Sequence, residues 1–270
     1  MASNPTSPIG IFDSGIGGLT VAKAVMDKLP NEDIIYFGDT ARVPYGIKSG
    51  QVIQRYASQI TRFLLQHNVK IILIACNTVS AVARETVENI AGKTPVLDVI
   101  EAGTKTAIDT GSNSIGVIGT LATIGSNAYE NALKKKNPDI DVISKACPLL
   151  VPLAEEGWID NEVAMKALDI YLSPFRNNGV RTLILGCTHY PLFKSSIRTL
   201  FKSHPLEIID SADAIASSAK TALKTLNLVN PSTSDGRFQC YVSDRPQRFQ
   251  ELAERFLGRK IDHVEIVDPD

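Results

Sequence analysis

The chain has 270 residues, of which 44% are hydrophobic and 21% charged, and these proportions exclude disordered and fibrous classes. Its 28 Lys and Arg nearly balance its 29 Asp and Glu, so no overall charge attracts nucleic acid or an anionic membrane. Residues 1–8 lack the basic and apolar regions of a secretory signal, and the longest apolar runs have the length of a strand. We expect a cytoplasmic globular protein that requires neither nucleic acid nor a membrane.

Short β-branched runs alternate along the chain with longer segments of helical periodicity. The predicted strands are Ile9–Phe12, Ile34–Phe37, Ile71–Ala75, Ile115–Gly119, Val142–Ser144, Thr182–Leu185, Glu207–Ile209, Phe238–Val242 and Val264–Val267. Between the first strands, apolar side chains fall on one helical face, as at Leu19, Ala22, Val25 and Leu29. This alternation predicts parallel sheets covered by helices on both faces, an α/β fold.

Two segments of the chain echo each other. Residues 70–78 (Lys-Ile-Ile-Leu-Ile-Ala-Cys-Asn-Thr) and 181–189 (Arg-Thr-Leu-Ile-Leu-Gly-Cys-Thr-His) each place a cysteine between an apolar strand and a helical pattern. A weaker echo links residues 9–15 with residues 115–121. Ligands of open α/β sheets bind outside the carboxyl ends of the strands. We therefore expect two related α/β units that meet near residue 97, each presenting one cysteine at a ligand site.

The four cysteines divide into two kinds by their surroundings. Cys76 and Cys187 precede helical patterns, and a helix N-terminus lowers a thiol pKa by favouring the thiolate, which suits a base or a nucleophile. Cys147 and Cys240 lack this context, and we expect them to be small buried hydrophobic residues. No two cysteines form a CxxC pair, so we expect no metal site.

Two further features accompany the cysteines. The segment Asp13-Ser-Gly-Ile-Gly-Gly18 follows a strand and precedes a helix, an arrangement that brings backbone N–H groups close to an anion. A structural turn explains this segment equally well, so it indicates a carboxylate site only together with the cysteines. His189 lies two residues after Cys187, and an imidazole there can orient the thiol or assist proton transfer.

Taken together, these motifs resemble those of the glutamate racemases, members of the cofactor-independent aspartate/glutamate racemase family. The matching segments keep the family's order and are Phe12–Leu19, Gly38–Gly46, Ala75–Thr78, Val99–Glu101, Thr120–Tyr129, Cys147–Leu153 and Gly186–Leu192. The resemblance implies two flavodoxin-like, Rossmann-like domains related by a pseudo-twofold axis, with the active site in the cleft between them. It implies a first domain of residues 1–97 plus 210–270 and a second domain of residues 98–209.

The resemblance also implies the reaction and its residues. It implies that L- and D-glutamate are the small-molecule substrates, without a cofactor or metal, and that D-glutamate is supplied for peptidoglycan; a homodimer is possible. Cys76 would remove the α-proton from D-glutamate and Cys187 from L-glutamate, assisted by Asp13 and His189. The family's active-site glutamate maps to Glu155, with Glu156 as the alternative. The substrate would be held by Asp13, Ser14, Pro44, Tyr45, Gly46, Asn77, Thr78, Thr120, Thr123, Thr188 and His189.

Other functions remain open on the sequence. An aspartate racemase, or another racemase that acts without pyridoxal phosphate, carries similar segments around both cysteines. A cysteine hydrolase could use Cys187 and His189 as nucleophile and base. A third alternative is an amino-acid-binding protein with inert cysteines, which would turn over neither glutamate nor aspartate.

Overall fold

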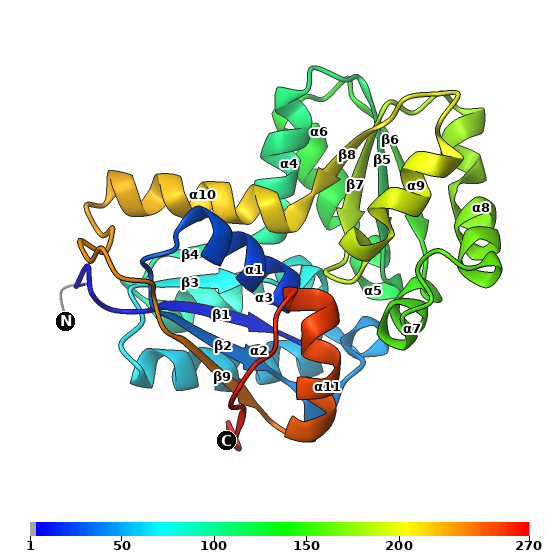
Figure 1. The fold of residues 1–270 in the computed structure, drawn as a ribbon. Helices are drawn as coiled ribbons and strands as arrows, with labels where there is room; N and C mark the ends of the chain where they lie inside the picture. Colours follow the sequence, from blue (N-terminus) through cyan, green and yellow to red (C-terminus); the bar gives the residue numbers. More distant parts are fainter. Residues whose placement is uncertain (1–3, 270) are drawn as a thin grey trace.

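The computed structural model describes residues 4–269 and contains two parallel β-sheets in separate lobes (Figure 1). The larger sheet has the strand order β10-β9-β2-β1-β3-β4, with β1 (Ile9–Asp13), β2 (Ile34–Gly38), β3 (Ile71–Ile74), β4 (Val96–Asp98), β9 (Phe238–Val242) and β10 (Glu265–Ile266). The smaller sheet has the order β6-β5-β7-β8, with β5 (Ser114–Gly119), β6 (Asp141–Ala146), β7 (Thr182–Gly186) and β8 (Glu207–Asp210). Every strand pair is parallel.

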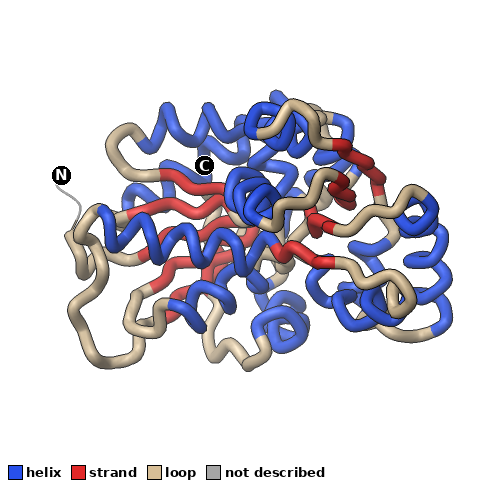
Figure 2. Tube along the Cα trace, turned by 90° about the horizontal axis from the view of Figure 1, so that it is seen from above, coloured by secondary structure: helices blue, strands red, loops and turns tan. Residues whose placement is uncertain are grey.

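Helices cover both faces of each sheet (Figures 1 and 2). Apolar side chains of the larger sheet pack against α1 (Leu19–Lys28), α10 (Ser211–Thr225) and α11 (Pro246–Leu257) on one face, and against α2 (Gly50–Gln66) and α3 (Asn77–Ala91) on the other. The smaller sheet lies between α4 (Val99–Asp109) with α6 (Ala128–Lys136) and α8 (Glu162–Asn177) with α9 (Lys194–Leu200). All five residues of β1 and of β7 are buried, which explains their continuous apolar runs.

Short helical segments complete the fold. They are η1 (Thr40–Arg42), η2 (Tyr45–Ile47), α5 (Leu121–Gly125), α7 (Leu150–Glu156) and η3 (Tyr190–Phe193). Within residues 4–269, no helix is both long and apolar enough to span a membrane.

The structure confirms the predicted α/β class with two parallel sheets. All nine predicted strands are present, and β6 extends beyond the predicted Val142–Ser144 at both ends. One strand, β4, was missed because it has only three residues and follows the polar segment at residues 92–95, so it gave no apolar run. It pairs with β3 at the edge of the larger sheet.

The two sheets repeat one topology. Strands β1–β4 take the order 2-1-3-4, and β5–β8 take the same order as 6-5-7-8, which accounts for both sequence echoes. In each half, the chain winds to opposite sides of a central pair, β1 with β3 and β5 with β7. Cys76 follows β3 and Cys187 follows β7, so each cysteine lies at the topological switch point of its sheet, where α/β folds bind ligands.

The chain passes from one sheet to the other at two equivalent places. Asp98 ends β4 and caps α4, accepting hydrogen bonds from the backbone N–H groups of Ile100 and Glu101. Asp210 ends β8 and caps α10 by accepting from the backbone N–H group of Ala212. A basic side chain pairs with each aspartate, Arg84 with Asp98 at 2.7 Å and Lys194 with Asp210. The sheets use residues 9–98 with 238–266 and residues 114–210, while the predicted domain limits stay a prediction.

A buried ion pair joins three distant parts of the larger lobe. Lys70 precedes β3 with a fully buried ammonium group, which donates to the carboxylate of Glu32 and to the carbonyl of Pro5. The other Glu32 oxygen accepts from the backbone N–H of Asn230 at 2.8 Å. Burial lowers the pKa of Lys70, and Glu32 opposes that shift. Removing one partner would leave a buried charge uncompensated.

We therefore predict that Lys70→Met lowers the free energy of unfolding by about 3–5 kcal/mol, because Glu32 loses its counter-charge. Urea unfolding followed by circular dichroism measures this. The double variant Lys70→Met/Glu32→Gln should recover part of the loss, since the neutral amide oxygen can still accept from Asn230. A loss below about 1 kcal/mol in Lys70→Met would show that the pair is not structurally important.

Candidate active site

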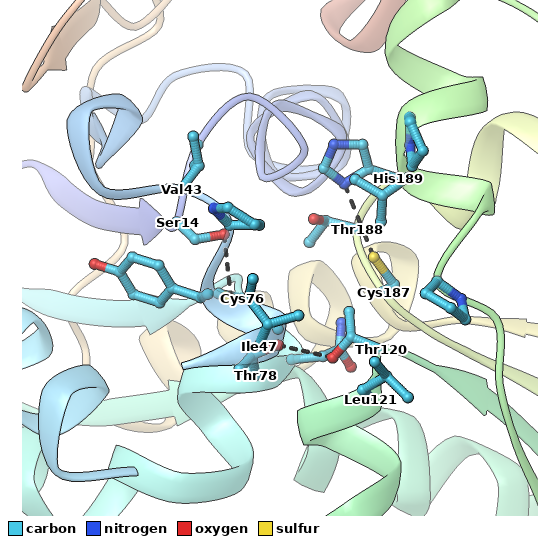
Figure 3. Close-up of a pocket in the computed structure, with 18 of the residues that line it drawn as sticks. Ser14, Val43, Ile47, Cys76, Thr78, Thr120, Leu121, Cys187, Thr188 and His189 are labelled. Atoms are coloured by element: carbon cyan, nitrogen blue, oxygen red, sulfur yellow. Dashed lines mark hydrogen bonds between the residues drawn. The ribbon is translucent and has the colours of Figure 1, made fainter. Parts of the chain in front are cut away.

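A cavity of about 430 Å³ opens where the carboxyl ends of the two sheets face each other (Figure 3). Both Cys76 and Cys187 line it, and all four cysteines of the chain are free thiols. The other predicted residues in its wall are Ser14, Pro44, Tyr45, Gly46, Asn77, Thr78, Thr120, Glu155, Thr188 and His189. The wall also contains Gly15 and Ile16 of the glycine-rich segment. It is completed by residues that were not predicted as site residues, namely Val43, Ile47, Leu121, Pro148, Val151 and Pro152. Asp13 and Thr123 lie buried behind it.

Cys76 is a buried thiol at the N-cap position of α3. Its S–H group donates to the hydroxyl of Ser14 over 3.6 Å. Burial raises the pKa of Cys76 to about 12, and the nearby Asp13 carboxylate adds to the rise, while hydrogen bonds from Val79 and Ser14 oppose it. The expected lowering of this pKa is therefore wrong. The N-terminal N–H groups of the helix do favour the thiolate, but the loss of water around the sulfur has the larger effect.

Cys187 has a different partner. The Nδ1 atom of His189 lies 3.8 Å from the Cys187 sulfur, and Nε2 lies 3.0 Å from a carboxylate oxygen of Glu155. Burial lowers the pKa of His189, but the hydrogen bonds and charges of Cys187 and Glu155 outweigh this and raise it to about 10. An imidazolium at neutral pH can donate to both neighbours at once. The aromatic ring of Phe256 packs edge-on against it, with ring centroids 5.2 Å apart.

The structure places Glu155, rather than Glu156, against His189. Glu156 carries an exposed carboxylate whose nearest cation is Arg248, at 3.8 Å. Both glutamates lie in the last turn of α7, where Arg255 of α11 donates to the backbone carbonyl of Glu155. Neither Arg255 nor Phe256 was predicted as part of the site, since no motif surrounds them. Only the return of α11 to the larger lobe brings them near α7 and His189.

The glycine-rich loop at residues 13–18 contacts the second cysteine segment directly. A Cβ atom on Gly17 would lie 2.3 Å from Thr188 Oγ1 and 2.5 Å from His189 Nδ1, so only glycine fits there. Asp13 accepts from the backbone N–H of Gly15 at 3.0 Å, and its other carboxylate oxygen is buried without a hydrogen-bond partner. Burial raises the pKa of Asp13, and His189 with three backbone N–H groups opposes the rise. This loop thus joins the surroundings of the two thiols.

A cluster of hydroxyl groups connects the two lobes on the other side of the cavity (Figure 3). Thr78 Oγ1 lies 3.1 Å from Thr120 Oγ1 and 3.3 Å from Thr123 Oγ1, and the last two are 3.0 Å apart. Thr120 also caps α5 by accepting from the Thr123 backbone N–H. None of the described residues in the cavity wall is Lys or Arg. Neutral donors, helix N-termini and the His189 imidazolium are thus the available partners for an anion.

Tyr45 enters the wall from a loop that Asp39 holds in place. The Tyr45 hydroxyl donates to the Asp39 carboxylate, which also accepts from Arg42 at 2.7 Å and from Ser243 at 2.8 Å. The phenol is therefore engaged away from any substrate, and Tyr45 can contribute only its ring and its backbone. Within residues 4–269, no cluster of His, Cys, Asp or Glu could hold a metal ion.

Comparison with known proteins shows the family. Residues 20–219 match the Asp/Glu/hydantoin racemase family. The chain is 50% identical over 261 residues to the glutamate racemase of Syntrophus aciditrophicus, with 96% of each chain covered. The chain belongs to the Asp/Glu/hydantoin racemase family. This racemase is also 51% identical over 262 residues to the glutamate racemase of Chlorobaculum tepidum, with 97% of this chain and 96% of the relative covered.

A solved structure shares the whole fold of this racemase. The glutamate racemase of Francisella tularensis, crystallised in complex with D-glutamate, matches it with a TM-score of 0.93 and 44% identity. The match covers 98% of this chain and 99% of that one. The family resemblance of the motifs is confirmed, and the chain is an enzyme of the racemase class.

The pKa of His189 gives a prediction for this racemase. In ¹⁵N-labelled protein, the His189 ring should keep both N–H protons through neutral pH and lose one as the pH rises through about 10. The stability that its bonds contribute is thus complete below the unfolded value of 6.5 and disappears between 6.5 and about 10. Glu155→Gln should lower the His189 pKa by about 1–3 units, because the adjacent negative charge is lost.

Glu156→Gln is the matched control for that titration. It removes the same charge one residue away, where the carboxylate is exposed and faces Arg248. The His189 pKa should therefore stay unchanged in this variant. An equal shift of the His189 pKa in both variants would mean that Glu155 acts on His189 only through long-range electrostatics and not through their hydrogen bond.

Proposed function

We propose that this racemase interconverts L-glutamate and D-glutamate by a two-thiol mechanism, with Cys76 and Cys187 as the opposed acid and base. The observation that carries the proposal is the pair of free, buried thiols that reach one cavity from the switch points of two different sheets. Inversion at Cα needs a base on one face and an acid on the other, and the reverse reaction exchanges their roles. Two identical groups satisfy this demand in both directions.

The surroundings of the two thiols indicate the direction in which racemisation starts when Cys76 carries its proton. With a pKa of about 12, Cys76 is protonated at neutral pH and is ready to donate. Cys187 lies beside the His189 imidazolium, which compensates negative charge on the sulfur. In this state Cys187 takes the α-proton of L-glutamate, and Cys76 supplies a proton to the opposite face. The D-to-L direction starts from the state in which Cys76 has lost its proton and Cys187 carries one.

Neutral donors bind the substrate in this proposal. The N-termini of α3 and α5, with Asn77, Thr78, Thr120 and Thr188, offer N–H and O–H groups to the carboxylates. Such fixed donors also stabilise negative charge that develops at Cα, without a cofactor as electron sink. Ser14, Pro44, Tyr45 and Gly46 line the same wall. We propose Asp13 and His189 as the groups that assist Cys76 and Cys187 respectively, and Glu155 as the partner of His189.

Relatives support glutamate as the substrate. The proteins of Syntrophus aciditrophicus and Chlorobaculum tepidum are glutamate racemases at about half identity, and the Francisella tularensis enzyme was crystallised with D-glutamate. We propose that the D-glutamate formed here supplies peptidoglycan synthesis in the cytoplasm. We also propose that the enzyme forms a homodimer. Each chain would have two domains, one of residues 1–97 plus 210–270 and one of residues 98–209.

The two-thiol mechanism predicts that Cys76→Ala and Cys187→Ala each reduce racemisation by about 10²–10⁴-fold or more, since neither variant keeps both an acid and a base. Circular dichroism of L- or D-glutamate in deuterated water follows the reaction. Any residual α-proton exchange should favour D-glutamate in Cys187→Ala and L-glutamate in Cys76→Ala, because each variant keeps the thiol on one face.

Cys240→Ala is the control for these variants. Cys240 is equally buried but lies in β9, outside the cavity wall, so its loss should leave racemisation near the native rate. L-aspartate, assayed in parallel, tests the substrate choice. Near-native racemisation in either Cys76→Ala or Cys187→Ala would falsify the two-thiol mechanism, and preferential turnover of aspartate would reject glutamate as the substrate.

A further inference from the structure

We propose that Tyr129 is a positioning residue that fixes the amide of Asn77, so that the Asn77 NH₂ group faces the cavity and binds a substrate carboxylate. The inference rests on the proposed function, because it assigns a donor to the same amino-acid substrate. Tyr129 belongs to α6 of the smaller lobe and Asn77 to α3 of the larger lobe, so the contact crosses between the lobes.

The hydrogen bond between these side chains is short and buried. The Tyr129 hydroxyl donates to Asn77 Oδ1 at 2.6 Å, and the two residues are 2% and 3% exposed. Burial raises the pKa of Tyr129 well above its usual value, and the nearby acidic groups Asp98, Cys187 and Asp210 add to the rise. The phenol therefore keeps its proton at neutral pH and can donate to Asn77.

This bond decides which way the amide points. An asparagine side chain has an acceptor oxygen on one side and a donor NH₂ group on the other. Because Tyr129 holds the oxygen, the NH₂ group must take the remaining side, and Asn77 lines the cavity. The Asn77 Nδ2 atom is buried and has no hydrogen-bond partner in the protein. A buried donor without a partner is unfavourable unless a ligand supplies the acceptor.

The packing of the Tyr129 ring relates this donor to the second thiol. A Cβ atom on Gly186 would lie 3.0 Å from the ring, tighter than an ordinary contact, so glycine at this position leaves room for the side chain. Gly186 ends β7 directly before Cys187. One side chain thus packs beside the strand that carries Cys187 and bonds to the residue that follows Cys76.

The absence of Lys and Arg from the described part of the cavity wall makes such a neutral donor important, because the His189 imidazolium there is already bonded to Cys187 and Glu155. No Lys or Arg occurs among the described residues of the cavity wall, so a carboxylate there depends on N–H and O–H groups held in fixed directions. If the amide turned over, its oxygen would face the carboxylate and repel it. The Tyr129 hydroxyl prevents this reversal without touching the substrate.

A double-mutant cycle tests the proposal. Tyr129→Phe should lower kcat/KM for glutamate by about 10–100-fold, mainly through KM, because it weakens one hydrogen bond to a charged group. Asn77→Ala should lose a similar factor. In the double variant the Tyr129→Phe change should cause no further loss, because its effect passes through Asn77. An equal loss with and without Asn77, or native kinetics in Tyr129→Phe, would overturn the proposal.

Tyr190→Phe is the matched control for the cycle. It also removes a buried phenol, whose hydroxyl donates to the backbone carbonyls of Gly119 and Cys147. The fold-losses in kcat/KM of Tyr190→Phe and Asn77→Ala should multiply in the double variant, since the two side chains share no hydrogen bond. Thermal unfolding of every variant separates a loss of stability from a loss of binding.

A second variant keeps the proposal testable if Tyr129→Phe does not fold. Asn77→Asp keeps an acceptor for Tyr129 but turns an oxygen toward the cavity, so stabilisation by glutarate, an unreactive dicarboxylate, should disappear in a thermal-shift assay. If glutarate stabilises Asn77→Asp as much as it stabilises the unmodified protein, the proposed orientation of the amide is overturned. If the unmodified protein fails to racemise glutamate, the proposed function fails, and the glutarate comparison still tests the amide.

Discussion

The close approach of the loop at residues 13–18 to the segment at residues 187–189 is the contact on which the site depends. At Gly17 the backbone lies so near Thr188 and His189 that a single methyl group would not fit. Thr20 strengthens the contact by donating to the Thr188 carbonyl at 3.1 Å. Without this approach, each cysteine would end a strand in its own lobe, and no common cavity would exist between the sheets.

The two halves share a topology, but their thiols have unlike surroundings. Cys76 has a serine hydroxyl and a buried carboxylate nearby, and burial dominates its pKa. Cys187 has an imidazole bonded to a glutamate. A symmetric fold therefore supplies opposed positions, while the residues around each sulfur differ in charge and in hydrogen bonding. This asymmetry is chemically useful, because an inversion needs one protonated and one deprotonated partner at each turnover.

Residues far from the thiols in the sequence hold their partners in place. Arg255 and Phe256 of α11 support Glu155 and His189, and Asp39 fixes the loop that presents Tyr45. Tyr129 holds Asn77 from the opposite lobe. His189, Asp39 and Tyr129 are buried, so their hydrogen bonds compete little with water. The site is thus a product of the interface between lobes as much as of either sheet.

The sequence alone determined the parallel α/β class, nine strands and the equivalence of Cys76 and Cys187, because apolar runs and strand–helix junctions are local patterns. It could not choose between Glu155 and Glu156, since the choice depends on a contact with His189 across 34 residues. It also gave the wrong direction for the Cys76 pKa and offered no signal for Arg255 or Phe256. Burial and contacts between distant segments exist only once the lobes have packed, and these decided the electrostatics and the supporting residues of the site.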